Sequence, residues 1–180
     1  MSNNILLGVT GSIAAYKAAE LANRMNKTGC SVHVIMTKSA QMFITPLTFQ
    51  TLTQNKVHTE MFERLSAVTV EHISLAKAAD AALVAPATAN ILGKLAHGIA
   101  DDMLSTVLMA LPSQTPLLVA PAMNTAMYEH PATQENLAVL KRRGVHVIAP
   151  RESRLACGDV GRGAMAEIET ILDEMERAVR

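Results

Sequence analysis

The sequence predicts an α/β protein with a three-layer, Rossmann-like (flavodoxin-like) parallel sheet and helices on both faces. Short apolar runs rich in branched residues alternate with longer amphipathic segments along the chain, which is the pattern of strands joined by crossover helices. A Thr-Gly-Ser turn follows the first apolar run, as in the opening of a mononucleotide-binding unit. Because no repeat or linker interrupts the sequence, we expect a single domain covering residues 1–180.

The first strand is expected at 5–9 and the first helix at 13–25. Between them, Gly11 allows close approach of the backbone to a ligand, and Ser12 either caps the helix or binds a phosphate at its positive end. The full GxGxxG pattern of dinucleotide sites is absent. A mononucleotide such as FMN is therefore a better candidate ligand than a dinucleotide.

The same patterns locate the remaining elements of the alternation. Further strands are expected at 32–36, 81–85, 117–120 and 145–149, with a short one within 53–67, and helices at 43–52, 73–79, 91–96, 103–111, 131–143 and 168–179.

Polar residues follow several of these strands, at the edge of the sheet where α/β proteins bind ligands. Thr37 and Ser39 follow the second strand, and Thr88 and Asn90 lie in a loop of small residues after the strand at 81–85. Asn124 follows the strand at 117–120 and offers two donors and an acceptor. Each of these residues has an alternative interpretation as a turn residue or a helix cap.

His72 immediately precedes the helix expected at 73–79. The partial positive charge of a helix N-terminus disfavours an imidazolium, so a neutral histidine able to accept a proton is expected there. Most of the six histidines should nevertheless be surface or structural residues.

Residues 151–163 are expected to form a long glycine-containing loop, able to close over a ligand as a flap. Cys157 lies in this loop and is a candidate reactive thiol, whereas Cys30 follows a helix end and is expected to be structural.

Composition excludes several classes of function. The formal net charge is zero, from 16 basic and 16 acidic side chains, which gives no reason to expect a nucleic-acid partner. No apolar run reaches the ~20 residues needed to cross a membrane, and the N-terminal segment, which has no basic residues ahead of its apolar run, is not expected to be a signal peptide. Two distant cysteines predict neither a metal site nor a disulfide framework and fit a reducing cytoplasm. The 11 methionines indicate an adaptable core or an oligomer interface.

Five segments together resemble the flavin-dependent cysteine decarboxylases. They are Gly-Ser-Ile-Ala-Ala-Tyr at 11–16, His-Ile-Ser-Leu at 72–75, Ala-Pro-Ala-Thr-Ala-Asn at 85–90, Pro-Ala-Met-Asn-x-x-Met at 121–127 and Ala-Cys-Gly-Asp-Val-Gly-Arg-Gly at 156–163. They run in the family's order from end to end of the chain. The branch that they resemble most acts on 4'-phospho-N-pantothenoylcysteine in coenzyme A biosynthesis and releases 4'-phosphopantetheine and carbon dioxide.

The resemblance implies FMN as cofactor and assigns residues to the site. It implies His72 as the base of the oxidative step and Cys157 as the proton donor of the reductive step. The substrate is implied to contact Asn124, Met127, Ala156 and Gly158, and the flavin to contact Gly11, Ser12, Ile13, Thr37, Ser39, Thr88, Ala89, Asn90 and Ala122. It also implies a homotrimer or a dodecamer of trimers, with flavin between neighbouring subunits, and a phosphopantothenoylcysteine synthetase as a partner.

Three other flavin proteins share parts of this pattern. A peptidyl-cysteine decarboxylase of a lantibiotic pathway would share His72 and Asn124 but would not need Cys157 to reduce a product. A flavin prenyltransferase would lack the segments at 121–127 and 156–163, and a non-catalytic regulatory subunit would have no need for His72 or Cys157. A nicotinamide-dependent dehydrogenase would suit the fold but not the glycine pattern.

Overall fold

Six parallel strands form the central sheet in the order β3-β2-β1-β4-β5-β6. The computed structural model describes residues 3–61, 71–154 and 160–179. The strands are β1 (Asn4–Val9), β2 (Ser31–Met36), β3 (Val57–His58), β4 (Ala81–Ala87), β5 (Leu117–Pro121) and β6 (His146–Val147). This is the doubly wound order of Rossmann-like proteins, so the predicted fold class is confirmed.

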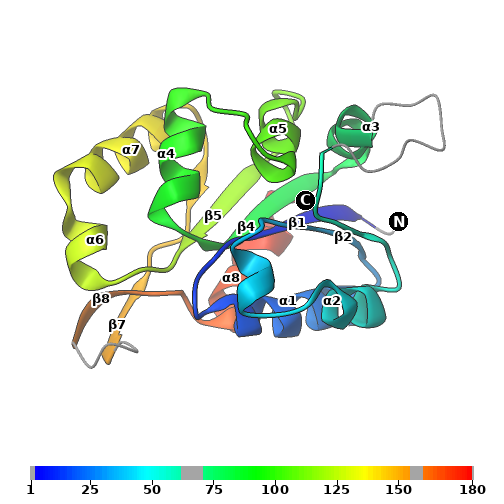
Figure 1. Cartoon of the computed structure of the whole chain (residues 1–180), viewed down its shortest axis with the longest axis horizontal. Helices are drawn as coiled ribbons and strands as arrows, with labels where there is room; N and C mark the ends of the chain where they lie inside the picture. The colour runs from blue at the N-terminus through cyan, green and yellow to red at the C-terminus, as the bar shows by residue number, and fades with distance from the viewer. Residues whose placement is uncertain (1–2, 62–70, 155–159, 180) are drawn as a thin grey trace.

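Helices cover both faces of the sheet (Figure 1). One face carries α1 (Ala15–Lys27), α2 (Pro46–Thr53) and α8 (Ile168–Ala178), and the other carries α3 (Glu71–Ala78), α4 (Ala89–His97), α5 (Met103–Met109) and α7 (Pro131–Arg142). A 3-10 turn, η1 (Ala40–Met42), and a short helix, α6 (Thr125–Glu129), complete the helical elements among the described residues.

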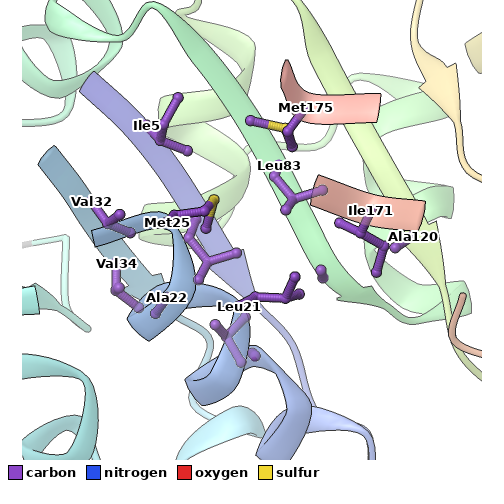
Figure 2. Packing of buried hydrophobic residues seen from close by; sticks show 14 of the residues in the cluster. Ile5, Leu21, Ala22, Met25, Val32, Val34, Leu83, Ala120, Ile171 and Met175 are labelled. Carbon is purple, nitrogen blue, oxygen red and sulfur yellow. The ribbon is translucent and has the colours of Figure 1, made fainter. Parts of the chain in front are cut away.

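Two cores are built by the alternation of side chains along the strands. In β1, Ile5 and Leu7 point into the core beneath α1 and α8, whereas Leu6 joins the core on the opposite face. Figure 2 shows the first of these cores, where Ile171 and Met175 of α8 pack toward the sheet beside Leu83 and Ile5. Burial of both faces explains why the strands are apolar runs in the sequence.

Several element boundaries differ from those expected. The first helix begins at Ala15, two residues later than predicted, because residues 11–14 form the turn. The last strand of the sheet is His146–Val147, shorter than the predicted 145–149. An additional helix, α6, precedes α7, where the sequence was expected to stay in a loop until Pro131.

A second, antiparallel sheet pairs β7 (Arg151–Arg154) with β8 (Val160–Ala164). The prediction of an irregular loop over 151–163 was therefore wrong for these two strands. Pairing between them supplies backbone hydrogen bonds that the side-chain pattern does not reveal. The predicted contact residues Ala156, Cys157 and Gly158 lie outside the described residues.

Across the described ranges, we find no helix that combines the length and the apolar character needed to span a membrane.

Candidate active site

The loops that follow β1 and β4, at the centre of the sheet, are joined by the buried residue Thr10. Strand order reverses between β1 and β4, and open α/β sheets bind ligands at such a switch point. The hydroxyl of Thr10 donates to the carbonyl oxygen of Pro86 at 2.7 Å and accepts from the backbone N–H of Thr88 at 3.2 Å. The sequence interpretation missed Thr10, whose only signal was a polar residue at the end of an apolar strand.

The glycine turn after β1 packs directly on the loop after β2. A Cβ atom at Gly11 would lie 2.5 Å from Cβ of Ser39, so only glycine permits this approach. The hydroxyl of Ser12 accepts from the N–H of Ala14 at 3.3 Å, while the N-cap position of α1 is Ala14 itself. The alternative of Ser12 as the cap of this helix is therefore not what the structure shows.

A pocket of about 400 Å³ opens beside this turn. Its lining combines the start of α1, the residues after β5 and the second sheet. The predicted residues Ser12, Ile13, Ala122 and Asn124 line it, together with Tyr16, Lys17, Met123, Arg151, Ser153 and Gly163. The structure thus brings together two sequence segments that were predicted to bind flavin and substrate, and it adds cationic side chains that were not predicted.

Asn124 both caps a helix and lines the pocket. Its side-chain oxygen accepts from the N–H of Ala126 at 2.8 Å, at the N-cap position of α6. Capping uses the oxygen of the amide, whereas binding an anionic substrate group would use its nitrogen. Asn124 can therefore cap a helix and also bind substrate, and its role as a helix cap is confirmed.

The second sheet fixes the backbone on which Asn124 stands. The N–H of Met123 donates to the carbonyl oxygen of Gly163 at 2.9 Å. A side chain at Gly163, where φ is +154°, would collide with the carbonyl oxygen of Met123, and a Cβ atom at Gly161 would lie 2.6 Å from Oγ1 of Thr125. These glycines permit close packing against the pocket rather than only the flexibility that the sequence suggested.

Hydroxyl groups around the switch point fit a phosphorylated cofactor. Thr88 occupies the N-cap position of α4 without a side-chain cap bond, and Ala89 and Asn90 form the first turn of that helix. Within the described part of the chain, the hydroxyls of Thr88 and Ser39 have no hydrogen-bond partner. A helix N-terminus with adjacent hydroxyls is a binding site for phosphate, so these residues fit the phosphate of a flavin mononucleotide.

Thr37 lines a second pocket, of about 250 Å³, together with Lys38, Glu60, Asp101 and Asp102. Its hydroxyl accepts from the N–H of Ala40 at 3.2 Å, which is the turn-capping role considered as an alternative. Asp102 caps α5 and contacts Lys94 at 2.6 Å. Burial alone would raise the pKa of Asp102, but its bonds to Lys94 and Ser105 hold that pKa below its ordinary value.

His72 lies on α3, away from the pocket that contains Asn124. It lies near the N-terminus of this helix, as predicted, but the helix begins at Glu71, two residues earlier than expected, so His72 is its second residue; it is half-buried. Figure 1 shows α3 and α6 at opposite ends of the longest axis of the molecule. Met127, on α6, is 50% exposed and is not part of the pocket lining. The structure of one chain therefore separates the predicted base from the predicted substrate-binding residue.

Comparison with known proteins identifies similar chains. The flavoprotein family model matches residues 1–180. A probable phosphopantothenoylcysteine decarboxylase of Streptococcus mutans is 51% identical over 176 residues, which are 98% of each chain. The coenzyme A biosynthesis bifunctional protein CoaBC of Bacillus subtilis is 48% identical over 98% of this chain, which spans 43% of that protein's length. The solved FMN binding protein AtHal3 is 36% identical, with a TM-score of 0.85 over 98% of this chain and 96% of its own.

Proposed function

The chain belongs to the flavoprotein family, and from this membership we propose that it is an FMN-dependent decarboxylase of 4'-phospho-N-pantothenoylcysteine. The products are 4'-phosphopantetheine and carbon dioxide, and the pathway is coenzyme A biosynthesis. The observation that carries the proposal is the pocket at the switch point. Its lining combines Ser12 and Ile13 of the glycine turn with Ala122 and Asn124, and Thr88 and Ser39 offer hydroxyls nearby.

The flavin supplies an electron sink, since it can take two electrons from the substrate thiol and later return them. A cysteine carboxylate cannot leave as carbon dioxide unless the electrons of the broken bond are accepted elsewhere. The residues of the chain handle the substrate and its protons. We assign His72 to removing a proton in the oxidative step, Asn124 to holding the substrate carboxylate, and Cys157 to protonating the reduced product.

Two substitutions test this assignment on the purified flavoprotein. His72→Asn should keep its flavin but fail to reduce it when phosphopantothenoylcysteine is added without oxygen. Cys157→Ser should release carbon dioxide but stop at the oxidised product, which mass spectrometry distinguishes from phosphopantetheine. Normal phosphopantetheine from the Cys157→Ser variant would contradict the proton-donor role, and normal flavin reduction in the His72→Asn variant would contradict the base.

We propose that a complete site needs two copies of the chain, arranged in a closed ring of three. The separation of α3 from α6 supports this arrangement, because His72 of one copy can meet Asn124 of the next in head-to-tail contact. Exposed apolar side chains on α1, η1 and α2 support it as well. There Tyr16 is 62% exposed, Leu47 68% and Met42 85%, and exposed apolar groups of this kind mark protein interfaces.

Mixing two inactive variants tests the shared site. If His72 and Asn124 act from different copies, subunits of His72→Asn and of an Asn124 variant should form hybrid rings in which about a quarter of the sites are intact. Activity should therefore reappear when the two variants are unfolded together and refolded, and light scattering should give the mass of a trimer or of a dodecamer. No recovery in a mixture shown to be hybrid would place both residues in one chain.

A synthetase partner and a cytoplasmic location remain predictions. The similarity to a bifunctional protein of coenzyme A biosynthesis supports the first. The low cysteine count supports the second.

A further inference from the structure

A carboxylate directly before His72 is hydrogen-bonded by one basic side chain and lies beside a second, both at the edge of the sheet. Oε1 of Glu71, the first residue of α3, lies 3.0 Å from Nζ of Lys56 and 3.1 Å from Nδ1 of His58. His58 belongs to β3 and pairs in register with Ile35 of β2. The contact therefore links the first turn of α3 to the central sheet.

The helix α3 buries little apolar surface of its own. Among its eight residues only Ala76 is fully buried, and an alanine side chain contributes little apolar area. Ile73 is 37% exposed. Because the apolar contact is small, the charged contacts at Glu71 carry a larger share of the positioning than they would on a well-buried helix.

The chemistry of the three groups is consistent with a fixed arrangement. Burial lowers the pKa of His58 even though a carboxylate lies beside it, so the ring is neutral near pH 7. Its Nδ1 lies close to the carboxylate but makes no hydrogen bond to it, so Lys56 is the side chain that donates to Glu71 here. Burial alone would raise the pKa of Glu71, but its hydrogen bond from Lys56 and the adjacent His58 lower it, and the side chain stays ionised.

We propose that Glu71 is a positioning residue for the proposed base His72: its carboxylate, held by Lys56 beside His58, sets the place of the His72 imidazole in the active site. The inference rests on the function proposed above for His72. A proton can be transferred efficiently only within hydrogen-bond distance of its acceptor. Misplacing a reacting group by about 1 Å costs on the order of 100-fold in rate. Release of Glu71 should therefore slow the step that uses His72 without removing the flavin.

The experiment compares flavin reduction in the flavin-loaded protein after rapid mixing with phosphopantothenoylcysteine in the absence of oxygen. Glu71→Gln should lower the limiting rate of reduction by about 10- to 100-fold, with flavin content and the substrate concentration for half-saturation unchanged. The matched control is Glu169→Gln. Glu169 also lies in the first turn of a helix and pairs with a basic residue, Arg24, at 2.6 Å. This variant should reduce its flavin at the wild-type rate.

A second pair of variants covers the case in which Glu71→Gln does not fold. Lys56 is 54% exposed, so it can be replaced with little effect on packing. Lys56→Met should lower the limiting rate in the same direction, by about threefold to tenfold, and Lys56→Arg should restore it. If Lys56 had a purely structural role, Lys56→Met would also change flavin content or stability, and Lys56→Arg would not restore the limiting rate alone.

Two outcomes decide the inference. If Glu71→Gln and Lys56→Met both reduce flavin like the wild type while His72→Asn does not, Glu71 does not position the base and the proposed function stands. If His72→Asn also reduces its flavin normally, the base assignment fails and this inference fails with it.

Discussion

The two ends of the molecule that carry the proposed active-site residues are held in different ways. At the Asn124 end, backbone hydrogen bonds and close glycine contacts join the second sheet to the residues after β5. At the His72 end, one carboxylate joins a helix with a single fully buried residue to the edge strand. Steric contacts and backbone hydrogen bonds fix the Asn124 end, whereas charged side-chain contacts contribute more at the His72 end.

This difference has a functional meaning in the proposed enzyme. A substrate-binding residue needs a fixed backbone, which steric contacts provide at any pH. A base at the border between two subunits must be adjusted against a neighbouring chain, and a charged contact permits small movements that tight packing would not. Disruption of the first end should therefore affect stability and binding together, whereas disruption of the second should affect mainly rate and its dependence on pH.

The largest effect is expected from Gly163→Ala. The new methyl group would collide with the carbonyl oxygen of Met123, at a φ of +154° that alanine rarely adopts. We expect a loss of about 2 kcal/mol in the free energy of unfolding, or roughly 5 °C in the melting temperature, together with loss of substrate binding. Thermal melting and titration with substrate measure both changes.

The control for this variant is Gly93→Ala, in the interior of α4. There a Cβ atom would make only an ordinary contact, 3.5 Å from the side-chain nitrogen of Asn136. Helix propensity predicts a gain of up to about 1 kcal/mol. Wild-type melting of Gly163→Ala would contradict the view that steric contacts hold the Asn124 end.

An intermediate effect is expected from Asn124→Asp, which separates the two roles of this side chain. Aspartate caps helices as well as asparagine does, so α6 and the melting temperature should be retained. The variant loses the amide donors and adds a negative charge beside the substrate carboxylate. Substrate affinity should fall by about 10- to 100-fold, equivalent to about 1.4–2.7 kcal/mol.

Calorimetric or fluorescence titration of the Asn124→Asp variant measures the affinity. Unchanged affinity at unchanged stability would show that Asn124 is a helix cap only.

The smallest effect is expected from acidification, and it should act on the His72 end. Because burial lowers the pKa of folded His58 below its unfolded value of about 6.5, the unfolded chain takes up the proton first. The stability that His58 contributes is present above about pH 6.5 and falls as the pH drops toward its folded pKa, by at most about 1.4 kcal/mol per pH unit. Burial lowers the pKa of His33 in the same direction.

Urea unfolding between about pH 5 and 7 tests this expectation. His58→Gln should reduce the slope of stability against pH, leaving the part that His33 contributes. Glu71 stays ionised over this range because its pKa is lowered. An identical slope in His58→Gln and the wild type would show that the buried histidine does not link pH to the stability of this edge of the sheet.

Much of the fold and part of the site could be predicted from the sequence. Alternating apolar runs located the strands, because strands buried on both faces must be apolar on both. The glycine turn and the loop at 86–90 were located by local chemistry, and the structure places both at the switch point. The second sheet was missed because β7 and β8 carry polar and glycine residues without an apolar alternation. The two strands form by pairing with each other, and β8 also bonds to the backbone of Met123.

The sequence by itself determined the order of strands and helices, the residue types at the carboxyl ends of the strands and, through shared segments, the family. Those properties depend on neighbours in the chain, where propensity and periodicity act. Only the tertiary structure decided that Thr10 joins two loops, that Gly163 supports Met123, and that His72 lies at the far end from Asn124. These facts depend on contacts between residues distant in sequence, which packing and hydrogen-bond geometry choose only after the whole chain has folded.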